Sequence, residues 1–294
     1  MTSLITHKSV LLKETVDFLN VTPGGIFADA TLGGGGHTKE ILRRGGRVIG
    51  IDRDPQALEM ARKEIGDNKN FRGTLGNFNQ IDRVAKEYNE PEFNGVIFDL
   101  GLSSFQLLGT GRGFSFKKDE RLDMRASPTI SQTARDVINN FTREEIYEIF
   151  TKFGEERLSS RLADLIKARR SISPIDTTRD LYEIIRFVAG SEINAQKVAR
   201  RVFQALRIFV NDEVRNLKEA LPAALEIMRV RGRLVVISYH SLEDRIVKEF
   251  FRRCEKEGKV KILTKHPIGP AREEVYENTS SRSGKLRAVE KIYD

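Results

Sequence analysis

Four consecutive glycines, residues 33–36, stand between two stretches that have the pattern of buried β-strands. The first stretch covers residues 26–31, and the second covers residues 47–52 and ends in an acid, Asp52. Glycine has no Cβ, so it lets the backbone turn sharply from a strand into a helix and approach a ligand closely. A carboxylate at the tip of the next strand can hold the two hydroxyls of a ribose. The run therefore predicts a nucleotide-type cofactor site on an α/β sheet.

The cysteine content and the hydropathy pattern limit the classes of protein to which the chain can belong. At 294 residues and 39% hydrophobic content the chain can build a substantial core. Its one cysteine, Cys254, allows no intramolecular disulfide, and its first residues lack the apolar core of a signal peptide. No stretch approaches the roughly 20 apolar residues of a membrane span. We expect a cytoplasmic protein without membrane association, and the sequence indicates neither a metal site nor an oligomeric state.

The charge balance favours a polyanionic partner without proving one. The chain has 50 Lys and Arg residues against 42 Asp and Glu residues, a net charge of +8. Such an excess attracts phosphates and releases counterions on binding, which makes nucleic acid the natural candidate. A charge-rich surface that serves solubility or heat resistance explains the same numbers equally well, because both signs are interspersed.

The part of the chain from residue 25 to residue 99 alternates short apolar runs with helical patterns. This alternation is typical of a doubly wound parallel sheet. Asp54 and Pro55 mark one helix start, with the acid as N-cap and the proline in the first helical position. The expected strands cover residues 26–31, 48–52, 71–75 and 96–99, and the same pattern returns at residues 233–238, 260–263 and 286–293.

Between these two parts lies a tract with helical periodicity and without strand patterns. Ala134, Val137 and Ile138 recur at helical spacing, and Thr142 precedes the next apolar stripe at the distance of a capping box. We therefore expect one α/β domain built from residues 1–106 and 206–294. A helical subdomain, residues 107–205, is inserted into it.

The spacing of the glycines separates the candidate cofactors. The sequence contains no phosphate-binding loop of the type G-x-x-x-x-G-K-[ST]. The dinucleotide fingerprint G-x-G-x-x-G begins at Gly33 and Gly35 but has Thr38 in place of its third glycine. This weakens a nicotinamide-dependent oxidoreductase without excluding it. The better match is the first motif of S-adenosylmethionine-dependent methyltransferases, with Asp52 as the ribose-binding acid.

Asp99 ends the fourth expected strand and points into the crevice where α/β sheets bind their ligands. Amino-group methyltransferases commonly carry Asp or Asn followed by two prolines and an aromatic residue at this place, whereas this chain continues with Leu100 and Gly101. Asp99 therefore has two interpretations, a group that contacts ligands or the N-cap of the following turn.

Several further short stretches of sequence are not needed to form a generic sheet of this kind. They are distributed over nearly the whole chain. They are residues 7–12 (HKSVLL), 51–55 (IDRDP), 99–107 (DLGLSSFQL), 112–116 (RGFSF), 122–125 (LDMR), 203–211 (FQALRIFVN) and 237–245 (ISYHSLEDR). In these runs the chain resembles the MraW family, bacterial methyltransferases of small-subunit ribosomal RNA. Tyr239 replaces the phenylalanine expected there and adds a hydroxyl.

The resemblance implies a Rossmann-like class I methyltransferase sheet with an inserted all-α subdomain. It also implies S-adenosylmethionine as the methyl donor and the 4-amino group of a cytidine in the decoding region of 16S ribosomal RNA as the acceptor, in free RNA or in the assembled small subunit. The cofactor residues carried over are Gly33, Gly35, Gly36, His37, Asp52, Phe78, Asp99 and Gln106. Among them His37 has a second interpretation as a cap of the helix that follows the glycines.

The implied reaction needs help at the nucleophile, because the lone pair of a cytosine amine is delocalised into the ring. An acceptor bonded to the N–H would localise that pair and receive the developing positive charge. Asp99, or a backbone carbonyl beside it, is the first candidate, and His240 is a weaker one. A structural histidine within the turn at residues 238–241 is the alternative interpretation of His240.

The inserted subdomain is the expected clamp for RNA, since an enzyme that acts on a base must present it outside the stack. Arginines would contact phosphates and aromatic rings would stack on bases. The candidates are Arg112, Phe114, Phe116, Arg125 and Arg207. Each arginine could instead be solvated or paired with a nearby acid. A non-catalytic RNA-binding or assembly factor remains a further alternative, and it would bind the cofactor weakly or not at all.

Overall fold

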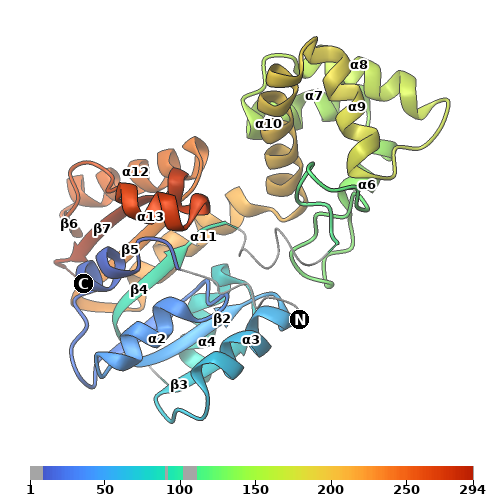
Figure 1. The fold of residues 1–294 in the computed structure, drawn as a ribbon. Coiled ribbons are helices and arrows are strands. Elements are labelled where there is room, and N and C mark those ends of the chain that lie inside the picture. The colour runs from blue at the N-terminus through green and yellow to red at the C-terminus, as the bar shows by residue number, and fades with distance from the viewer. Residues whose placement is uncertain (1–8, 90–91, 102–110, 294) are drawn as a thin grey trace. The chain divides into compact units, whose positions relative to one another are not determined.

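The computed structural model describes residues 9–89, 92–101 and 111–293. It divides into two compact units (Figure 1). Unit 1 combines Met1–Ser103 with Val214–Asp294, and unit 2 is Ser104–Glu213. No helix among the described residues is long and apolar enough to cross a membrane.

Unit 1 is built on a seven-stranded sheet with the order β3-β2-β1-β4-β5-β7-β6. The first five strands run parallel, and β7 is antiparallel to both of its neighbours. The direction of strand order reverses between β1 and β4, which is where such sheets bind ligands at their carboxyl ends. The strands are β1 Ile26–Asp29, β2 Arg47–Asp52, β3 Phe71–Leu75, β4 Phe93–Asp99, β5 Met228–Ser238, β6 Val260–Ile262 and β7 Lys285–Lys291.

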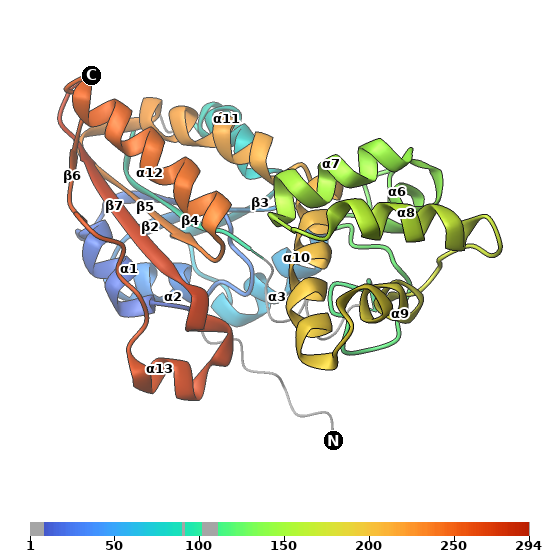
Figure 2. The ribbon, with the colours of Figure 1, turned by 90° about the horizontal axis from the view of Figure 1, so that it is seen from above.

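Helices cover both faces of this sheet, because apolar side chains alternate to both sides of its central strands (Figure 2). Buried residues of α4, α11 and α12 pack on one face, and those of α1 and α2 pack on the other. The helices of unit 1 are α1 Leu12–Leu19, α2 Gly36–Arg43, α3 Pro55–Ile65, α4 Ile81–Glu87, α11 Glu213–Glu226, α12 Ser241–Lys256 and α13 Arg272–Glu277, with 3-10 turns η1 Phe78–Gln80 and η2 Thr279–Ser283.

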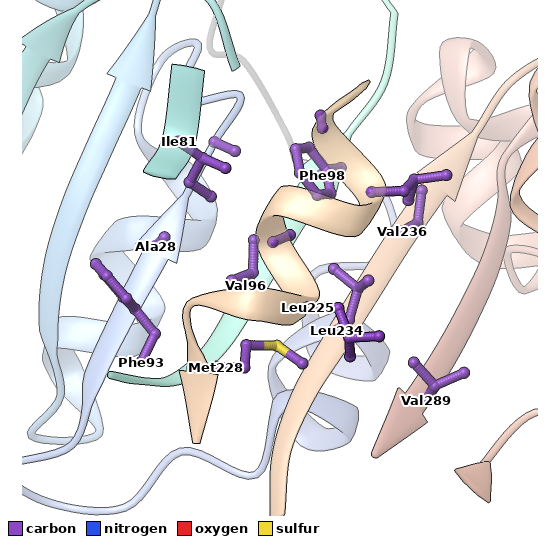
Figure 3. Packing of buried hydrophobic residues seen from close by; sticks show 14 of the residues in the cluster. Ala28, Ile81, Phe93, Val96, Phe98, Leu225, Met228, Leu234, Val236 and Val289 are labelled. Carbon is purple, nitrogen blue, oxygen red and sulfur yellow. The ribbon is translucent and has the colours of Figure 1, made fainter. Parts of the chain in front are cut away.

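The larger core cluster lies under α11 (Figure 3). Phe93, Val96 and Phe98 of β4 and Leu234 and Val236 of β5 contribute side chains that are at most 1% exposed. Burying each of them contributes about 1.5–3 kcal/mol to folding. This core holds the two central strands in register, so their carboxyl ends form a rigid rim.

Unit 2 is a helical bundle whose central element is α10, which contacts α6, α7 and α9. Three of its helices begin with complete capping boxes, at Thr133, Thr142 and Thr177, in which the threonine and an acid three residues later satisfy each other's backbone. Its helices are α6 Ala134–Asn140, α7 Arg143–Gly154, α8 Ser159–Arg170, α9 Thr178–Ala189 and α10 Glu192–Val210.

The expected fold class is confirmed, and the structure differs from the sequence analysis in three places. The sequence pattern did not predict α1. The strand expected at residues 233–238 is longer, because β5 already begins at Met228. The boundary expected at residue 205 falls inside α10, which continues as one helix to Val210 because apolar residues line its buried face throughout.

Candidate active site

Three acids meet at the carboxyl rim of the parallel strands. Asp29 ends β1, Asp52 ends β2 and Asp99 ends β4. The strands place them there because β1 pairs with both β2 and β4 in parallel register. The rim therefore carries carboxylates on both sides of the point where strand order reverses.

The glycine run forms the turn between β1 and α2, and two of its members, Gly35 and Gly36, have little space for a side chain. Gly33 and Gly35 have φ angles of 51° and 80°, in the left-handed region that favours glycine. A Cβ on Gly35 would lie 3.1 Å from Cδ1 of Ile65, and one on Gly36 would lie 2.0 Å from Oγ of Ser9. The bare backbone predicted from the sequence is therefore required by packing as well as by turn geometry.

Asp52 is held by two backbone N–H groups. Gly33 donates to its Oδ2 and Asp54 donates to its Oδ1, both at 2.8 Å. Burial raises the pKa of Asp52 to about 6, although these two hydrogen bonds lower it. Each carboxylate oxygen can accept a further hydrogen bond, so the arrangement suits the two hydroxyls of a ribose.

Asp99 has a partner on each side. The hydroxyl of Tyr239 donates to its Oδ1 at 2.7 Å, and Nδ1 of His37 lies 3.8 Å from its Oδ2. Its backbone N–H donates to Oγ1 of Thr31 at 2.6 Å. Asp99 is thus tied to β1, to α2 and to the end of β5.

The pKa of Asp99 rises to about 6, and burial is the largest cause. His37 and the hydrogen bond from Tyr239 lower it, whereas the neighbouring carboxylates of Asp29 and Glu243 raise it. A buried carboxyl with a pKa near neutrality can exchange a proton at physiological pH, as a general base requires.

His37 lies in the first turn of α2 and is buried, with 4% of its surface exposed. Its Nε2 lies 3.2 Å from the carbonyl oxygen of Val10, so a proton on Nε2 fits this contact. The neighbouring Thr38 donates from Oγ1 to Oδ2 of Asp29 at 2.7 Å, and burial raises the pKa of Asp29. His37 therefore connects the segment before α1 to the acid rim rather than capping α2, whose N-cap is Gly35.

Phe78 begins η1 directly after β3, next to the rim. Its ring is partly buried and meets the edge of Phe98 at a centroid distance of 5.8 Å. This position leaves part of the ring open to a planar group. Gln106, also expected at the cofactor, lies outside the described residues.

His240 is the N-cap of α12. Its Nδ1 accepts from the backbone N–H of Glu243 at 3.3 Å, and the Glu243 carboxylate accepts from the backbone N–H of His240 and of Tyr239. The structure thus supplies the capping contacts that the structural interpretation of His240 requires. Sequence reasoning missed the bond from Tyr239 to Asp99, and the departure from phenylalanine at 239 was the signal that could have found it.

The arginines expected at RNA have protein partners within unit 2. Arg125 forms a two-pronged ion pair with Asp123, at 2.7 and 2.8 Å. Arg207 donates to Glu213 at 3.0 Å, and Arg112 approaches the carbonyl oxygens of Arg125 and Ala126 at 3.4 and 3.3 Å.

The two phenylalanines of the same expected set are packed as well. Phe114 is 8% exposed. Phe116 stacks on Tyr182, with the rings nearly parallel at 5.4 Å, and meets the edge of Phe203. These contacts account for the five side chains as parts of unit 2 itself.

Other basic side chains of unit 2 are exposed and have no ion pair or hydrogen bond to the described residues. They are Arg157 in the turn before α8, Arg161 on α8, and Lys197 and Arg200 on α10. By contrast, Arg201, the residue after Arg200, forms an ion pair with the buried Glu156 at 2.6 Å. Helical spacing does not indicate this difference, because Lys197 lies three residues from Arg200 and four from Arg201, and both spacings place residues on one helix face.

Comparison with known proteins identifies the family of the chain. The model of the MraW methylase family matches residues 4–292. The chain is 44% identical to ribosomal RNA small subunit methyltransferase H of Carboxydothermus hydrogenoformans, over 98% of both chains. It is 41% identical to the protein of that name from Halothermothrix orenii, over 98% of this chain and 99% of the other.

Among solved structures, the fold is similar to that of an rRNA methylase from Streptococcus thermophilus. The TM-score is 0.48 and the sequence identity is 13%, with 97% of this chain and 98% of the other covered.

Proposed function

The chain belongs to the MraW methylase family, and from this premise we propose that it methylates the 4-amino group of a cytidine in the decoding region of 16S ribosomal RNA. Its methyl donor is S-adenosylmethionine. Its substrate is the free RNA or the assembled small subunit, which would place its work in the cytoplasm. Membership of a methylase family excludes the nicotinamide-dependent oxidoreductase that the sheet and the ribose acid left open.

The observation that carries the proposal is the acid rim above a bare glycine turn, in a chain that matches this family over nearly its whole length. A protein that kept only an RNA-binding surface would have no need to hold Asp52 and Asp99 buried with raised pKa values. Such carboxyls are costly to folding, so their retention supports an intact site.

When bound, S-adenosylmethionine supplies a methyl group activated on a sulfonium. Asp52 would hold the ribose hydroxyls with its two oxygens, and the backbone at Gly35 and Gly36 would lie against the methionine part. Phe78 would pack on the adenine. These roles agree with the hydrogen bonds of Asp52, with the place of the glycine turn between β1 and α2 and with the open part of the Phe78 ring. Gln106 is a further proposed contact.

Asp99 would accept a hydrogen bond from the amine of the cytosine. The nitrogen lone pair forms the new N–C bond, the electron pair of the breaking S–C bond stays on sulfur, and the amine proton leaves toward the Asp99 carboxylate and then to water. Holding the amine in line with the methyl group is the larger part of catalysis in such a displacement. His240 is assigned the role of a cap and not of this acceptor.

Unit 2 would contact the RNA. Arg157, Arg161, Lys197 and Arg200 are exposed and have no acidic partner among the described residues. They are therefore better candidates for phosphate contacts than Arg125 and Arg207, whose guanidinium groups have acidic partners. We retain Arg112, Phe114 and Phe116 as proposed supports of that surface, since they build the loop and the packing of unit 2.

Nucleoside mass spectrometry tests the function. The full chain is incubated with methyl-labelled S-adenosylmethionine and with small-subunit RNA lacking the modification, either free or in assembled particles. We expect labelled 4-methylcytidine in at least one of the two and none with Asp52→Ala. Absence of methylated cytidine from both would contradict the proposal, and a labelled base other than cytidine would contradict its substrate.

A further inference from the structure

The hydroxyl of Tyr239 has no role in the packing of unit 1, yet it is aimed at the acid rim. The ring lies against the apolar cluster formed by α1, α2 and the central strands, as a phenylalanine ring would. Only the hydroxyl goes further, and it donates to Oδ1 of Asp99 at 2.7 Å. A neutral hydroxyl at this distance from a carboxylate oxygen forms a hydrogen bond of normal length.

The local backbone places this hydroxyl with little freedom. Asp99 pairs with Ile237 in the parallel register of β4 and β5, so Tyr239 follows two residues beyond the end of that pairing. Its backbone N–H donates to Oε2 of Glu243 at 2.9 Å within the cap of α12. The ring then passes over Gly101, where a Cβ would lie 3.1 Å from Cδ2 of Tyr239 and where φ is +118°.

The charged groups that face Asp99 among the described residues have opposite effects on its pKa. Asp29 on β1 and Glu243 on α12 repel its negative charge, and His37 on α2 stabilises it. Burial and then the charge of Asp99 itself raise the pKa of the Tyr239 phenol, and Glu243 on α12 and Glu274 on α13 raise it further. The Tyr239 hydroxyl is therefore a proton donor that stays neutral and stabilises the carboxylate form of Asp99.

We propose that Tyr239 is a positioning residue for methyl transfer, whose hydroxyl keeps Asp99 ionised and leaves one lone pair of the carboxylate facing the amine of the substrate. This inference rests on the proposed function, since it assigns Asp99 the role of acceptor. It accounts for a tyrosine at a position where the packing needs only a phenyl ring.

Tyr239→Phe removes the hydroxyl alone and tests the proposal. A hydrogen bond to a charged group contributes about 1.5–3 kcal/mol, which corresponds to about one pKa unit or more. We expect kcat below pH 7 to fall about five- to ten-fold, and the midpoint of its rise with pH to move up by about one unit. The affinity for S-adenosylhomocysteine, measured by calorimetry, should change by less than about three-fold because the ring and the backbone stay in place.

Tyr88→Phe is the matched control. Its hydroxyl also forms a short side-chain hydrogen bond in unit 1, to Oγ1 of Thr74 at 2.6 Å, but it lies outside the site. We expect the wild-type pH profile from this variant. Equal losses in the two variants, an unmoved pH midpoint in Tyr239→Phe, or a loss confined to cofactor affinity would each overturn the proposal.

A titration of the apoprotein separates this inference from the proposed function. With 13C-labelled aspartate, the carboxyl resonance that disappears in Asp99→Asn identifies Asp99, and its midpoint should lie about one unit higher in Tyr239→Phe than in the wild type. If the wild type makes no methylcytidine but the midpoint moves, the function is wrong and the coupling is real. If the wild type is active and the midpoint stays, the assignment of Tyr239 is wrong.

Discussion

At the scale of single residues, Asp99 and Asp52 show that buried carboxyl groups in a binding site can lower the stability of the fold. Burial raises the pKa of each to about 6. The native state therefore holds a proton on these groups at pH values where the unfolded chain, with a pKa near 3.8, has lost it. Ionising them in the fold opposes stability, and a ligand that donates hydrogen bonds to them offsets that cost.

We expect Asp99→Asn to become more stable relative to the wild type as pH rises from about 4 to about 6. The native pKa is raised, so the wild type loses stability across this window and the amide does not; the difference reaches at most about 3 kcal/mol. Urea unfolding of the apoprotein at several pH values measures it.

Asp244→Asn provides a control of opposite sign in the same unit. Burial raises the pKa of Asp244, but hydrogen bonds and charge from Arg287 outweigh this and lower it below its usual value. Its carboxylate therefore stabilises the fold above that pKa, and the variant should lose stability relative to the wild type as pH rises. A flat difference for Asp99→Asn would show that its carboxyl is not desolvated.

At the scale of elements, caps decide where the helices around the site begin. Gly35 begins α2 in a left-handed conformation, Asp54 caps α3 and His240 caps α12. The last of these also positions the chain just before it, because Glu243 of the same cap binds the backbone N–H of Tyr239. A side chain that looks catalytic from its position at a strand end can thus serve the site through the helix that it starts.

We expect His240→Asn to keep both the stability and the methylation rate of the wild type, since asparagine is among the best N-caps. His240→Ala should lose about 1 kcal/mol of unfolding free energy. Denaturant unfolding and single-turnover rates are compared for both variants. A rate loss of a hundred-fold or more in a stable His240→Asn variant would show that His240 takes part in methyl transfer.

At the scale of the whole molecule, the net charge of +8 is a small excess of bases over acids, and many basic side chains of both units form ion pairs with nearby acids. Exposed ion pairs of this kind contribute little to stability. The charges that attract a polyanion are those without an acidic partner, and within the part of the chain that the structure describes they include Arg157 and Arg161 of unit 2.

Reversing both charges, in Arg157→Glu with Arg161→Glu, should weaken binding to small-subunit RNA and flatten its dependence on salt. Losing two phosphate contacts lowers the slope of log K against log salt by roughly 1.4–1.8. Fluorescence anisotropy over a range of salt concentrations measures it. Lys152→Glu, whose lysine pairs with Glu148 on α7, is the control and should leave the slope nearly unchanged.

The sheet and the cofactor residues could be predicted from the sequence because their signals are local. Glycines at a turn, an acid at a strand end and an N-cap before a proline each act within a few residues, and the structure places Gly33, Asp52 and Asp54 where these patterns indicate. Strand direction could not be predicted in this way: β7 is antiparallel because of how the chain returns to the sheet, not because of its own residues.

The alternation of strands and helices, the glycine turn at residues 33–36, the acids at the strand ends and, through distant motifs, the family can all be inferred from the amino-acid sequence. The three-dimensional fold, in contrast, is needed to see which of these side chains already have a partner within the protein. Arg125 is paired with Asp123, Phe116 is stacked on Tyr182, and the hydroxyl of Tyr239 reaches Asp99 across 140 residues of chain. Spacing along the chain predicts hydrogen bonds within a helix cap, but contacts between distant segments depend on distances of a few ångströms that only the fold sets.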